Sequence, residues 1–403
     1  MTTTETTASG LIAQENQYGA HNYHPLDVVC TKGEGVFLTD VDGKKYMDFL
    51  AAYSAVNQGH NHPKIGEAMI KQIRTLALTS RAFRNDQFPP LLEKLCKITG
   101  FDKALLMNSG AEAVETALKA MRKWGYDKKG IEYGKAEIIV AEGNFHGRTT
   151  TIVGFSTDPD STSRFGPFTP GFVIVPYGDL EAVKQAINPN TCAIFMEPIQ
   201  GEGGVIIPPD GFLKGLREVA TANNCLLVLD EIQSGLGRTG KWFAFEHEGI
   251  RPDGITIGKA LSGGYYPVSA FLASDEVMDV FTPGIHGSTY GGNPLACAVA
   301  SAALDVLVDE KLVERAAELG EYFAKRLRGM KSDKVELVRV RGLWAGVQLK
   351  ESAGKARPYC YKLKDRGMLC KDTHEQIIRL APPLVITKEQ IDWAIEQLEA
   401  VLA

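Results

Sequence analysis

The stretch that decides the fold is Leu226-Leu227-Val228-Leu229-Asp230-Glu231. It begins with apolar residues and ends in two carboxylates, which predicts a strand buried on both faces with Asp230 at its carboxyl end. A second short strand, over 254–258, ends in the same way and leads directly into Lys259. Open α/β sheets bind ligands at the carboxyl ends of their strands, so we expect Asp230 and Lys259 to face one site.

A carboxylate and an amine at one edge of a sheet suit a cofactor that reacts as an aldehyde. The amine can form an imine with that aldehyde, and the carboxylate can keep a ring nitrogen protonated. The alternative is a salt bridge at a strand end together with an unrelated surface lysine. Asp230 and Lys259 alone do not decide between these interpretations.

The composition sets the class of protein. A chain of 403 residues can hold two or more packed domains, and 44% hydrophobic with 23% charged residues is typical of a soluble globular protein. The net charge of -5 argues against nucleic-acid binding. The seven cysteines are scattered and form no CxxC pair, which predicts reduced thiols in the cytoplasm and no metal site.

Neither a membrane span nor a targeting segment is predicted. No apolar stretch approaches the length that crossing a bilayer requires. The first ten residues are rich in Thr and lack the basic and apolar blocks of a signal peptide and the arginines of a transit peptide. We expect them to form a frayed tail.

Three regions follow one another along the chain. Residues 1–57 form an N-terminal segment with a β-hairpin that turns at Asp42-Gly43. Residues 58–303 alternate strands and helices, which predicts a large α/β domain with a mostly parallel sheet covered on both faces. Residues 304–403 predict a smaller α+β domain. The expected strands of the large domain are 103–107, 137–141, 173–175, 193–196, 226–229 and 255–257, and its helices are 64–77, 89–99, 111–124, 179–187, 211–223 and 294–308.

A helix start with anion-binding character follows the first of these strands. Ser109 and Glu112 fit an S-x-x-E capping box, and Gly110 between them allows a ligand to approach the backbone. The free N–H groups at a helix start favour a phosphate. The alternative is a capped helix with a purely structural role.

Phe145-His146-Gly147-Arg148 stands at the end of another strand. The aromatic residues can stack on a flat ring, and Arg148 can hold a carboxylate through two hydrogen bonds. A structural histidine and a surface arginine are the alternatives.

Three further features are polar residues that could serve a binding site. Glu197 and Glu202 lie on one glycine-rich loop and are either an acid/base pair or a solvated loop. Ser288 and Thr289 in the loop 286–294 offer a second phosphate contact. Arg379 has apolar neighbours, and a buried arginine requires an anionic partner from the protein or from a ligand.

A nucleotide site at 235–241 is rejected. Gly-Leu-Gly-Arg-Thr-Gly-Lys matches G-x-G-x-x-G and nearly matches a P-loop, but Trp242 stands where a P-loop needs a hydroxyl. The stretch also lies several residues after its strand and does not lead into a helix, as a dinucleotide fingerprint should.

The order of the motifs is far more specific than any one of them. Ser-Gly-Ala-Glu-Ala (109–113), Phe-His-Gly-Arg-Thr (145–149), Glu-Pro-Ile-Gln-Gly-Glu-Gly-Gly (197–204), Asp-Glu-Ile-Gln-Ser-Gly (230–235), Gly-Lys-Ala-Leu-Ser-Gly-Gly (258–264) and His-Gly-Ser-Thr-Tyr-Gly-Gly-Asn-Pro (286–294) together resemble the class III pyridoxal-phosphate (PLP) dependent aminotransferases, over residues 15–403. The resemblance implies the fold type I of PLP-dependent transferases, with a seven-stranded sheet in the large domain.

Other stretches resemble the ornithine aminotransferase branch of that class. They are Asn22-Tyr23-His24-Pro25, Ser54–His60, Leu78–Phe83 and Ile378–Ile386. The branch implies transfer of the δ-amino group of L-ornithine to 2-oxoglutarate by a ping-pong mechanism, giving L-glutamate and glutamate 5-semialdehyde, which cyclises to pyrroline-5-carboxylate. It also implies a homodimer or higher homo-oligomer with shared active sites.

The resemblance implies a role for each matching residue. Lys259 would hold PLP covalently and move the substrate proton, Asp230 would pair with the ring nitrogen, and Glu202 would neutralise Arg379 until a substrate carboxylate replaces it. The implied cofactor-binding residues are Ser109, Gly110, Ala111, Phe145, His146, Glu197, Asp230, Gln233, Lys259 and, from the other subunit, Ser288 and Thr289. The implied substrate-binding residues are Tyr23, Tyr53, Phe145, Arg148, Glu202 and Arg379.

One residue departs from the ornithine pattern. Animal members of that branch have Trp after the stacking Phe, whereas this chain has His146, as acetylornithine aminotransferases do. An acetylornithine or another ω-amino-acid aminotransferase, such as one for 4-aminobutyrate, is therefore the alternative prediction.

Overall fold

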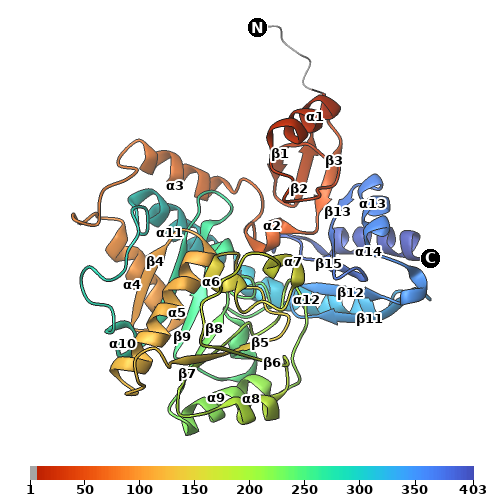
Figure 1. Cartoon of the computed structure of the whole chain (residues 1–403). Coiled ribbons are helices and arrows are strands. Elements are labelled where there is room, and N and C mark those ends of the chain that lie inside the picture. Colours follow the sequence, from red (N-terminus) through yellow and green to blue (C-terminus); the bar gives the residue numbers. More distant parts are fainter. Residues whose placement is uncertain (1–6) are drawn as a thin grey trace.

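A mixed seven-stranded sheet forms the centre of the computed structural model, which describes residues 7–403 (Figure 1). The strand order is β4-β10-β9-β8-β7-β5-β6. Neighbours from β9 to β6 are parallel, and β10 is antiparallel to both β9 and β4. The strands are β4 Lys103–Met107, β5 Glu137–Ala141, β6 Phe172–Val175, β7 Thr191–Met196, β8 Leu226–Asp230, β9 Gly254–Ile257 and β10 Ser269–Ala273.

The predicted fold class is confirmed, and all six predicted strands are present. The motif pattern did not place the seventh strand, β10, although all of its residues are buried. Its short apolar run follows a glycine- and proline-rich stretch, which sequence patterns assign to a loop. The register pairs Phe271 of β10 with both Leu105 and Thr256, so β10 joins β4 to the strands of the site.

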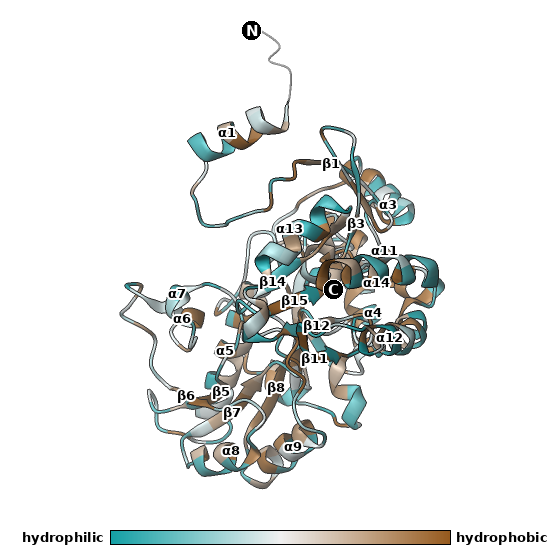
Figure 2. Cartoon of the chain, turned by 90° about the vertical axis from the view of Figure 1, so that its right-hand side faces the viewer, coloured by the Kyte–Doolittle hydropathy of each residue, from teal (hydrophilic) through white to brown (hydrophobic). Residues whose placement is uncertain are grey.

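Helices cover both faces of this sheet because successive strand residues point to opposite sides. Ile138 and Val140 of β5 pack in one apolar cluster with Leu118 of α5, whereas Ile139 packs in another with Leu216 of α9. The strands β7 and β8 are brown, and therefore apolar, in the interior (Figure 2). The helices of this region are α3 Pro63–Ile73, α4 Phe88–Thr99, α5 Gly110–Asp127, α8 Leu180–Ala186, α9 Phe212–Ala222 and α11 Pro294–Asp309.

The N-terminal segment contains the predicted hairpin. Strands β2 (Phe37–Asp40) and β3 (Lys45–Asp48) are antiparallel, and β1 (Cys30–Glu34) extends their sheet. The expected frayed tail is only partly within the described residues, since 1–6 lie outside them. From Ala8 the chain forms helix α1 (Ala8–Tyr18), so that expectation is wrong for residues 8–10.

The C-terminal region forms a smaller antiparallel sheet, β11-β12-β15-β14, with helices beside it. The neighbouring short strand β13 (Met368–Leu369) pairs with β3 instead, so one sheet joins the two ends of the chain. The predicted boundary at 303/304 falls within α11, and the division into three regions stays a prediction. The other elements here are α12 Leu312–Arg328, β11 Val335–Val340, β12 Ala345–Leu349, α13 Arg357–Asp365, β14 Lys371–Thr373, β15 Ile377–Leu380 and α14 Lys388–Leu402.

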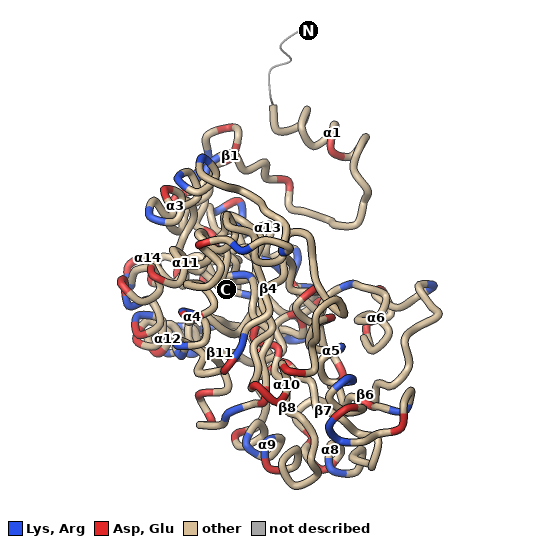
Figure 3. The backbone as a smooth tube through the Cα atoms, turned by 90° about the vertical axis from the view of Figure 1, so that its left-hand side faces the viewer, with Lys and Arg blue, Asp and Glu red and all other residues tan. Residues whose placement is uncertain are grey.

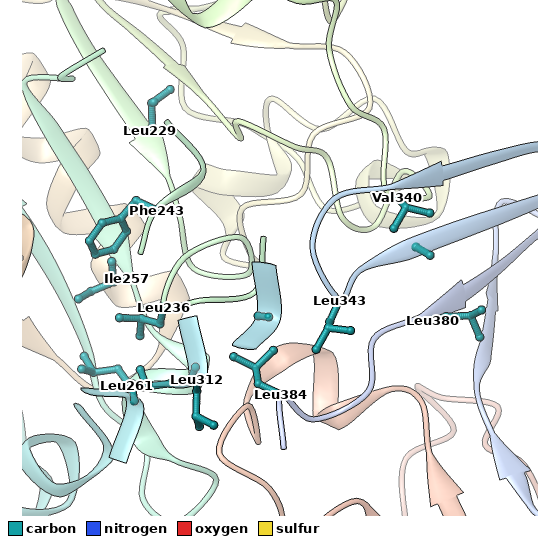
Figure 4. Packing of buried hydrophobic residues seen from close by; sticks show 14 of the residues in the cluster. Leu229, Leu236, Phe243, Ile257, Leu261, Leu312, Val340, Leu343, Leu380 and Leu384 are labelled. Atoms are coloured by element: carbon teal, nitrogen blue, oxygen red, sulfur yellow. The ribbon is translucent and has the colours of Figure 1, made fainter. Parts of the chain in front are cut away.

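A continuous apolar core connects the two sheets. Leu229 and Ile257 belong to the same cluster as Leu343 and Leu380, and Leu384 lies between these groups (Figure 4). The strand that carries Asp230 is thus packed through side chains to the strand that carries Arg379. Because protein interiors are close-packed, this core fixes the distance between the two strands.

The remaining elements are short. They are α2 Ala51–Ser54, α6 Thr150–Val153, α7 Pro159–Thr162, α10 Asp275–Met278 and the 3-10 turns η1 Ala244–Glu248, η2 Lys259–Ser262 and η3 Glu351–Ala353. The outer helices carry both signs of charge in alternation (Figure 3). Among residues 7–403, no helix combines the length and the apolar character needed to cross a membrane. Within the same residues, no group of three His, Cys, Asp or Glu side chains is placed to hold a metal ion.

Candidate active site

A cavity of about 140 Å³ lies at the carboxyl ends of β8 and β9. Most of the predicted cofactor-binding residues line it, although they come from five separate stretches of the chain. They are Gly110, Ala111, Phe145, His146, Glu197, Asp230, Gln233 and Lys259. Ser109, Ser288 and Thr289 do not line it.

Asp230 is buried at the end of β8 and is held by three donors. Its Oδ2 lies 2.6 Å from His146 Nδ1, and its Oδ1 accepts hydrogen bonds from Thr256 Oγ1 (3.0 Å) and from the backbone N–H of Ile232 (3.1 Å). These contacts fix the orientation of the carboxylate group at the edge of the cavity.

Lys259 follows β9 and opens the 3-10 turn η2 with a φ of 42°. The residue is half-buried, and the burial of its amine lowers the pKa of that group, while the charges of Glu202 and Asp230 raise it in part. The net shift of the pKa is downward. A lysine with a lowered pKa is a better nucleophile near neutral pH because more of it is unprotonated.

The first residues of α5, Gly110 and Ala111, also line the cavity. The predicted capping box is present: Ser109 Oγ accepts from Glu112 N at 3.3 Å, and Glu112 Oε2 accepts from Ser109 N at 2.6 Å. Ser109 is therefore occupied by the cap. The next backbone N–H groups, those of Gly110 and Ala111, have no acceptor within the helix and stand at its positive end.

Gln233 and Glu197 are buried polar residues of the cavity. Gln233 Nε2 is buried and has no hydrogen-bond partner within residues 7–403. Glu197 accepts from Phe145 N at 3.1 Å and from Gly201 N at 3.4 Å. Burial, with the charge of Asp230, raises the pKa of Glu197 to about 7 against a partial opposing effect of His146.

His146 lies behind Asp230. Its side chain is completely buried, its ring centroid is 4.3 Å from that of Phe195, and its Nε2 has no partner among the described residues. The position was predicted to contact the cofactor. His146 lines the cavity, so that contact stays a prediction, and its hydrogen bond to Asp230 also makes it a support for that carboxylate.

A second, larger cavity of about 610 Å³ lies between the N-terminal segment and the C-terminal region. Tyr23, Tyr53 and Arg148 line it, as the predicted substrate residues should. The Arg148 guanidinium stands 5.5 Å from the ring centroid of Phe145, which lines the smaller cavity. Arg148 and Phe145 therefore connect the two cavities.

Arg379 and Glu202 form an ion pair between β15 and the glycine-rich loop. Arg379 Nη1 donates to Glu202 Oε1 at 2.8 Å and to Gly201 O at 3.1 Å, and the arginine side chain is only 1% exposed. Its Nε and Nη2 are buried without partners in the part of the chain that the structure describes. The ring centroid of Tyr53 lies 4.8 Å from the guanidinium carbon. Glu202 thus supplies the anionic partner that the sequence required.

Ser288 and Thr289 lie apart from Lys259 in the loop before α11. Ser288 Oγ accepts from Asn108 Nδ2 at 2.9 Å and from Gly291 N at 3.1 Å. Thr289 is exposed. Within one chain, this loop therefore contributes no side chain to the cavity.

Sequence reasoning missed three residues around the site. Thr256 was counted only as part of a strand, although a lone hydroxyl in a buried apolar run is itself a signal. Lys371 lines the larger cavity and carried no motif signal. Arg238, in the rejected nucleotide motif, is fully buried and donates to Leu343 O (2.9 Å) and Pro382 O (2.7 Å), so this loop joins the two sheets.

Comparisons with known proteins agree with this geometry. The family "Aminotransferase class-III" matches residues 18–402. The ornithine aminotransferase of Geobacillus sp. (strain WCH70) is 58% identical over 98% of both chains.

Solved structures give the same result. The ornithine aminotransferase of Toxoplasma gondii is 44% identical with a TM-score of 0.96, covering 98% of this chain and 95% of that one, and another structure of it reveals partial occupancy of PLP at the active site. The acetylornithine aminotransferase of Elizabethkingia anophelis is 49% identical with a TM-score of 0.89, covering 98% of each chain.

Proposed function

The chain belongs to the class III aminotransferases, and from this premise we propose that it transfers the δ-amino group of L-ornithine to 2-oxoglutarate. The products are L-glutamate and glutamate 5-semialdehyde, which cyclises to pyrroline-5-carboxylate. The observation that carries the proposal is the 2.8 Å ion pair between Glu202 and Arg379. It neutralises the guanidinium while the reacting end of the substrate, which in ornithine bears no carboxylate, occupies the site.

PLP is the cofactor, and when bound it supplies an aldehyde that accepts the amino group and a ring that withdraws electrons from the reacting carbon. The donors that have no partner among residues 7–403 fit it. Gln233 Nε2 matches its phenolic oxygen, and the N–H groups of Gly110 and Ala111 match its phosphate. Asp230 would hold a proton on its ring nitrogen, because the carboxylate is buried and is fixed by three donors.

Lys259 is the acid and base of the reaction in this proposal. Burial lowers the pKa of its amine, so Nζ can take the proton from Cδ of ornithine in the first half-reaction and deliver a proton to Cα of the glutamate formed in the second. Phe145 lines the same cavity and would stack on the ring of the cofactor.

Tyr23 and Arg148 would bind the α-carboxylate of ornithine. Both line the larger cavity, and Arg148 reaches the junction with the smaller one. A substrate whose carboxylate is held there presents its far amine, the δ-amine, toward Lys259. This selects the δ-amine over the α-amine through position, because the α-amine stays beside the bound carboxylate.

The acceptor substrate requires the opposite state of Arg379. 2-Oxoglutarate carries a carboxylate next to its reacting carbon, and the buried Nε and Nη2 of Arg379 are free to bind it. A guanidinium that is already neutralised by Glu202 attracts a second carboxylate only weakly, so we expect Glu202 to leave it, and each substrate then favours one of two ion-pair states. Replacement Glu202→Ala should change the ratio of the two half-reaction rates, and an unchanged ratio would refute this exchange of partners.

Product analysis tests the reaction as a whole. The purified enzyme should convert ornithine and 2-oxoglutarate into pyrroline-5-carboxylate, trapped with o-aminobenzaldehyde, in step with glutamate. Lys259→Ala should abolish the product. Formation of the α-keto acid of ornithine in place of pyrroline-5-carboxylate would contradict δ-specificity.

Acetylornithine is the second candidate donor. His146, rather than Trp, follows the stacking Phe145, and a relative named acetylornithine aminotransferase is 49% identical. A panel of ornithine, N-acetylornithine and 4-aminobutyrate separates the candidates through kcat/KM. A higher kcat/KM for N-acetylornithine than for ornithine would show that N-acetylornithine is the preferred donor.

We also propose a homodimer that shares its active sites. Apolar side chains stay exposed on α3 and on the chain that follows it, including Ile70 (52%), Ile73 (53%) and Phe83 (68%). Leu295 N donates to Ala77 O at 3.4 Å, so the loop with Ser288 and Thr289 lies beside this surface. A second copy bound here would bring that loop to the partner's phosphate site. Light scattering should give twice the chain mass of 43.9 kDa, and the mass of a single chain would refute the proposal.

A cytoplasmic location and a role in arginine degradation or proline biosynthesis complete the proposal. The described cysteines are all unpaired thiols, as the reducing cytoplasm favours. The reaction connects ornithine with the precursor ring of proline. Cell fractionation tests the location, and growth of a deletion strain on arginine or without proline tests the direction.

A further inference from the structure

Lys371 is a cation of the larger cavity to which the proposed function gives no task. It begins β14 and lines the cavity together with Tyr53 and Arg148. No ion pair found within residues 7–403 includes its ammonium group, although the residue is half-buried. Two other basic groups of this wall have partners, since Arg357 binds Asp372 at 3.3 Å and His60 lies 2.8 Å from Asp48. Arg148, the remaining arginine of the cavity, already has a proposed task in binding the α-carboxylate of ornithine.

The strand register places Lys371 directly opposite Arg379. The two residues are partners in the antiparallel pair of β14 and β15, so their side chains share one face. Both also lie over the ring of Tyr53, at 5.4 Å for Lys371 Nζ and 4.8 Å for the Arg379 guanidinium carbon. Like charges directly opposite each other destabilise a sheet. An arrangement of this kind is stable where an anion can serve both cations.

Glu202 is that anion. Its carboxylate binds Arg379 at 2.8 Å, and its backbone is attached to the strand of Lys371, because Thr373 Oγ1 donates to Glu202 O at 2.6 Å. Thr373 is two residues from Lys371, and residues two apart on a strand face the same side. Glu202 is thus anchored on the face that carries both cations.

Glu202 depends on nearby cations to keep its charge in this partly buried place. Burial raises the pKa of this carboxyl. The charge and hydrogen bond of Arg379, followed by the charges of Lys259 and Lys371, lower it by more, so the net shift of the pKa is downward. The side chain is 27% exposed, so water hydrates it only in part. A charge in such a place is costly without a partner.

We propose that Lys371 is a positioning residue that receives the carboxylate of Glu202 when Arg379 turns to a substrate carboxylate. The inference rests on the proposed exchange of partners at Arg379, and it names the cation that Glu202 binds after it leaves Arg379. Lys371 would then stabilise only the state that binds 2-oxoglutarate or glutamate. The state that binds ornithine keeps Glu202 on Arg379 and does not need Lys371.

The variant Lys371→Met tests this without chemistry. Glutarate has two carboxylates and no carbonyl, so its binding to the holoenzyme requires Arg379 to be free, whereas pentanoate needs only the far carboxylate site. Calorimetry should show glutarate binding about tenfold more weakly in Lys371→Met, within the usual range of coupling between two ligands, and pentanoate binding unchanged. The KM for 2-oxoglutarate should rise by a similar factor, and the KM for ornithine should not.

Matched variants exclude a general effect of charge or folding. Lys371→Arg keeps the charge and should restore glutarate binding. Lys355→Met removes a cation that pairs with Glu375 at 2.7 Å outside the cavity, and it should bind glutarate like the unaltered enzyme. Thermal unfolding of all variants checks that they are folded.

A double variant decides whether Lys371 acts through Glu202. In a Glu202→Gln background there is no charge to receive, so adding Lys371→Met should not weaken glutarate binding further. A further tenfold loss would show that Lys371 binds the ligand directly and would overturn the inference. The inference also fails if Lys371→Met alone binds glutarate normally while Glu202→Gln does not, and in that case the proposed function still stands. If Glu202→Gln leaves both half-reactions unchanged, the exchange at Arg379 itself is wrong.

Discussion

Removal of one hydroxyl behind the site should weaken the hold on PLP. Thr256 Oγ1 donates to Asp230 Oδ1 at 3.0 Å, and both residues are buried. The substitution Thr256→Val keeps the shape of the side chain and removes this donor. A hydrogen bond to a charged group contributes about 1.5–3 kcal/mol, and the other two donors of Asp230 remain, so we take the lower value. That corresponds to about a tenfold change in an equilibrium constant.

The expected result is a dissociation constant for PLP about tenfold higher, together with a fall in kcat of similar size, because Asp230 is then less firmly directed at the ring nitrogen. Fluorescence titration of the apoenzyme measures the first quantity, and the ornithine assay measures the second. Thr239→Val is the matched control, since Thr239 is also buried but lies near His247 outside the cavity. If both variants hold PLP equally well, Asp230 is fixed by His146 and Ile232 alone and the reasoning is wrong.

Three other substitutions test the scaffold of the site. Glu231 is buried, and burial raises the pKa of its carboxyl from 4.5 to about 7. Its contribution to stability, about 3 kcal/mol at most, is therefore complete below pH 4.5 and lost as the pH rises through 7. Glu231→Gln should flatten the fall in thermal stability between pH 5 and 8, and an unchanged slope would contradict this. Arg238→Met should lower the free energy of unfolding in urea by about 3 kcal/mol, since it leaves buried carbonyl groups without donors; a loss below about 1 kcal/mol would mean that water replaces the guanidinium. His60→Ala should remove the partner of Asp48 Oδ2 and lower the unfolding free energy by about 1 kcal/mol. It should also raise the KM for ornithine, because Asp48 holds the turn that carries Tyr53. An unaltered KM would show that the contact between His60 and Asp48 does not affect substrate binding.

The sequence predicted the large sheet well because parallel strands are buried on both faces and appear as uninterrupted apolar runs. It also predicted which residues would meet at Asp230 and Lys259, since strand ends of one sheet meet at one edge. The motifs 109–113 and 145–149 joined them there, as expected. The position of β10 was missed because its short apolar run follows a glycine- and proline-rich stretch that is typical of a loop.

Residues whose role depends on register could not be predicted. Lys371 has significance only because β14 pairs with β15 in the register that places it opposite Arg379. A shift of one residue would turn its side chain to the other face. Arg238 is similar, because the carbonyl groups that it binds lie more than 100 positions away. Its motif indicated a loop, and only the fold shows that the loop joins two sheets.

The turn that carries Tyr53 lies beyond sequence patterns for a different reason. Ala51–Ser54 has an ordinary helical composition, yet all four residues have a positive φ, between 45° and 75°. Each such residue costs roughly 1 kcal/mol or more, and left-handed residues normally occur singly. Contacts made elsewhere must compensate, and Asp48 Oδ1 accepts from the backbone N–H of Leu50 (2.8 Å) and Ala51 (3.0 Å) at the start of the turn. Glycine would relieve the strain but would leave the segment free to move. The strained turn instead holds the ring of Tyr53 in a fixed position beside the guanidinium of Arg379. Arg379 exchanges one ion-pair partner for another, and a rigid neighbour keeps its guanidinium in place in both states.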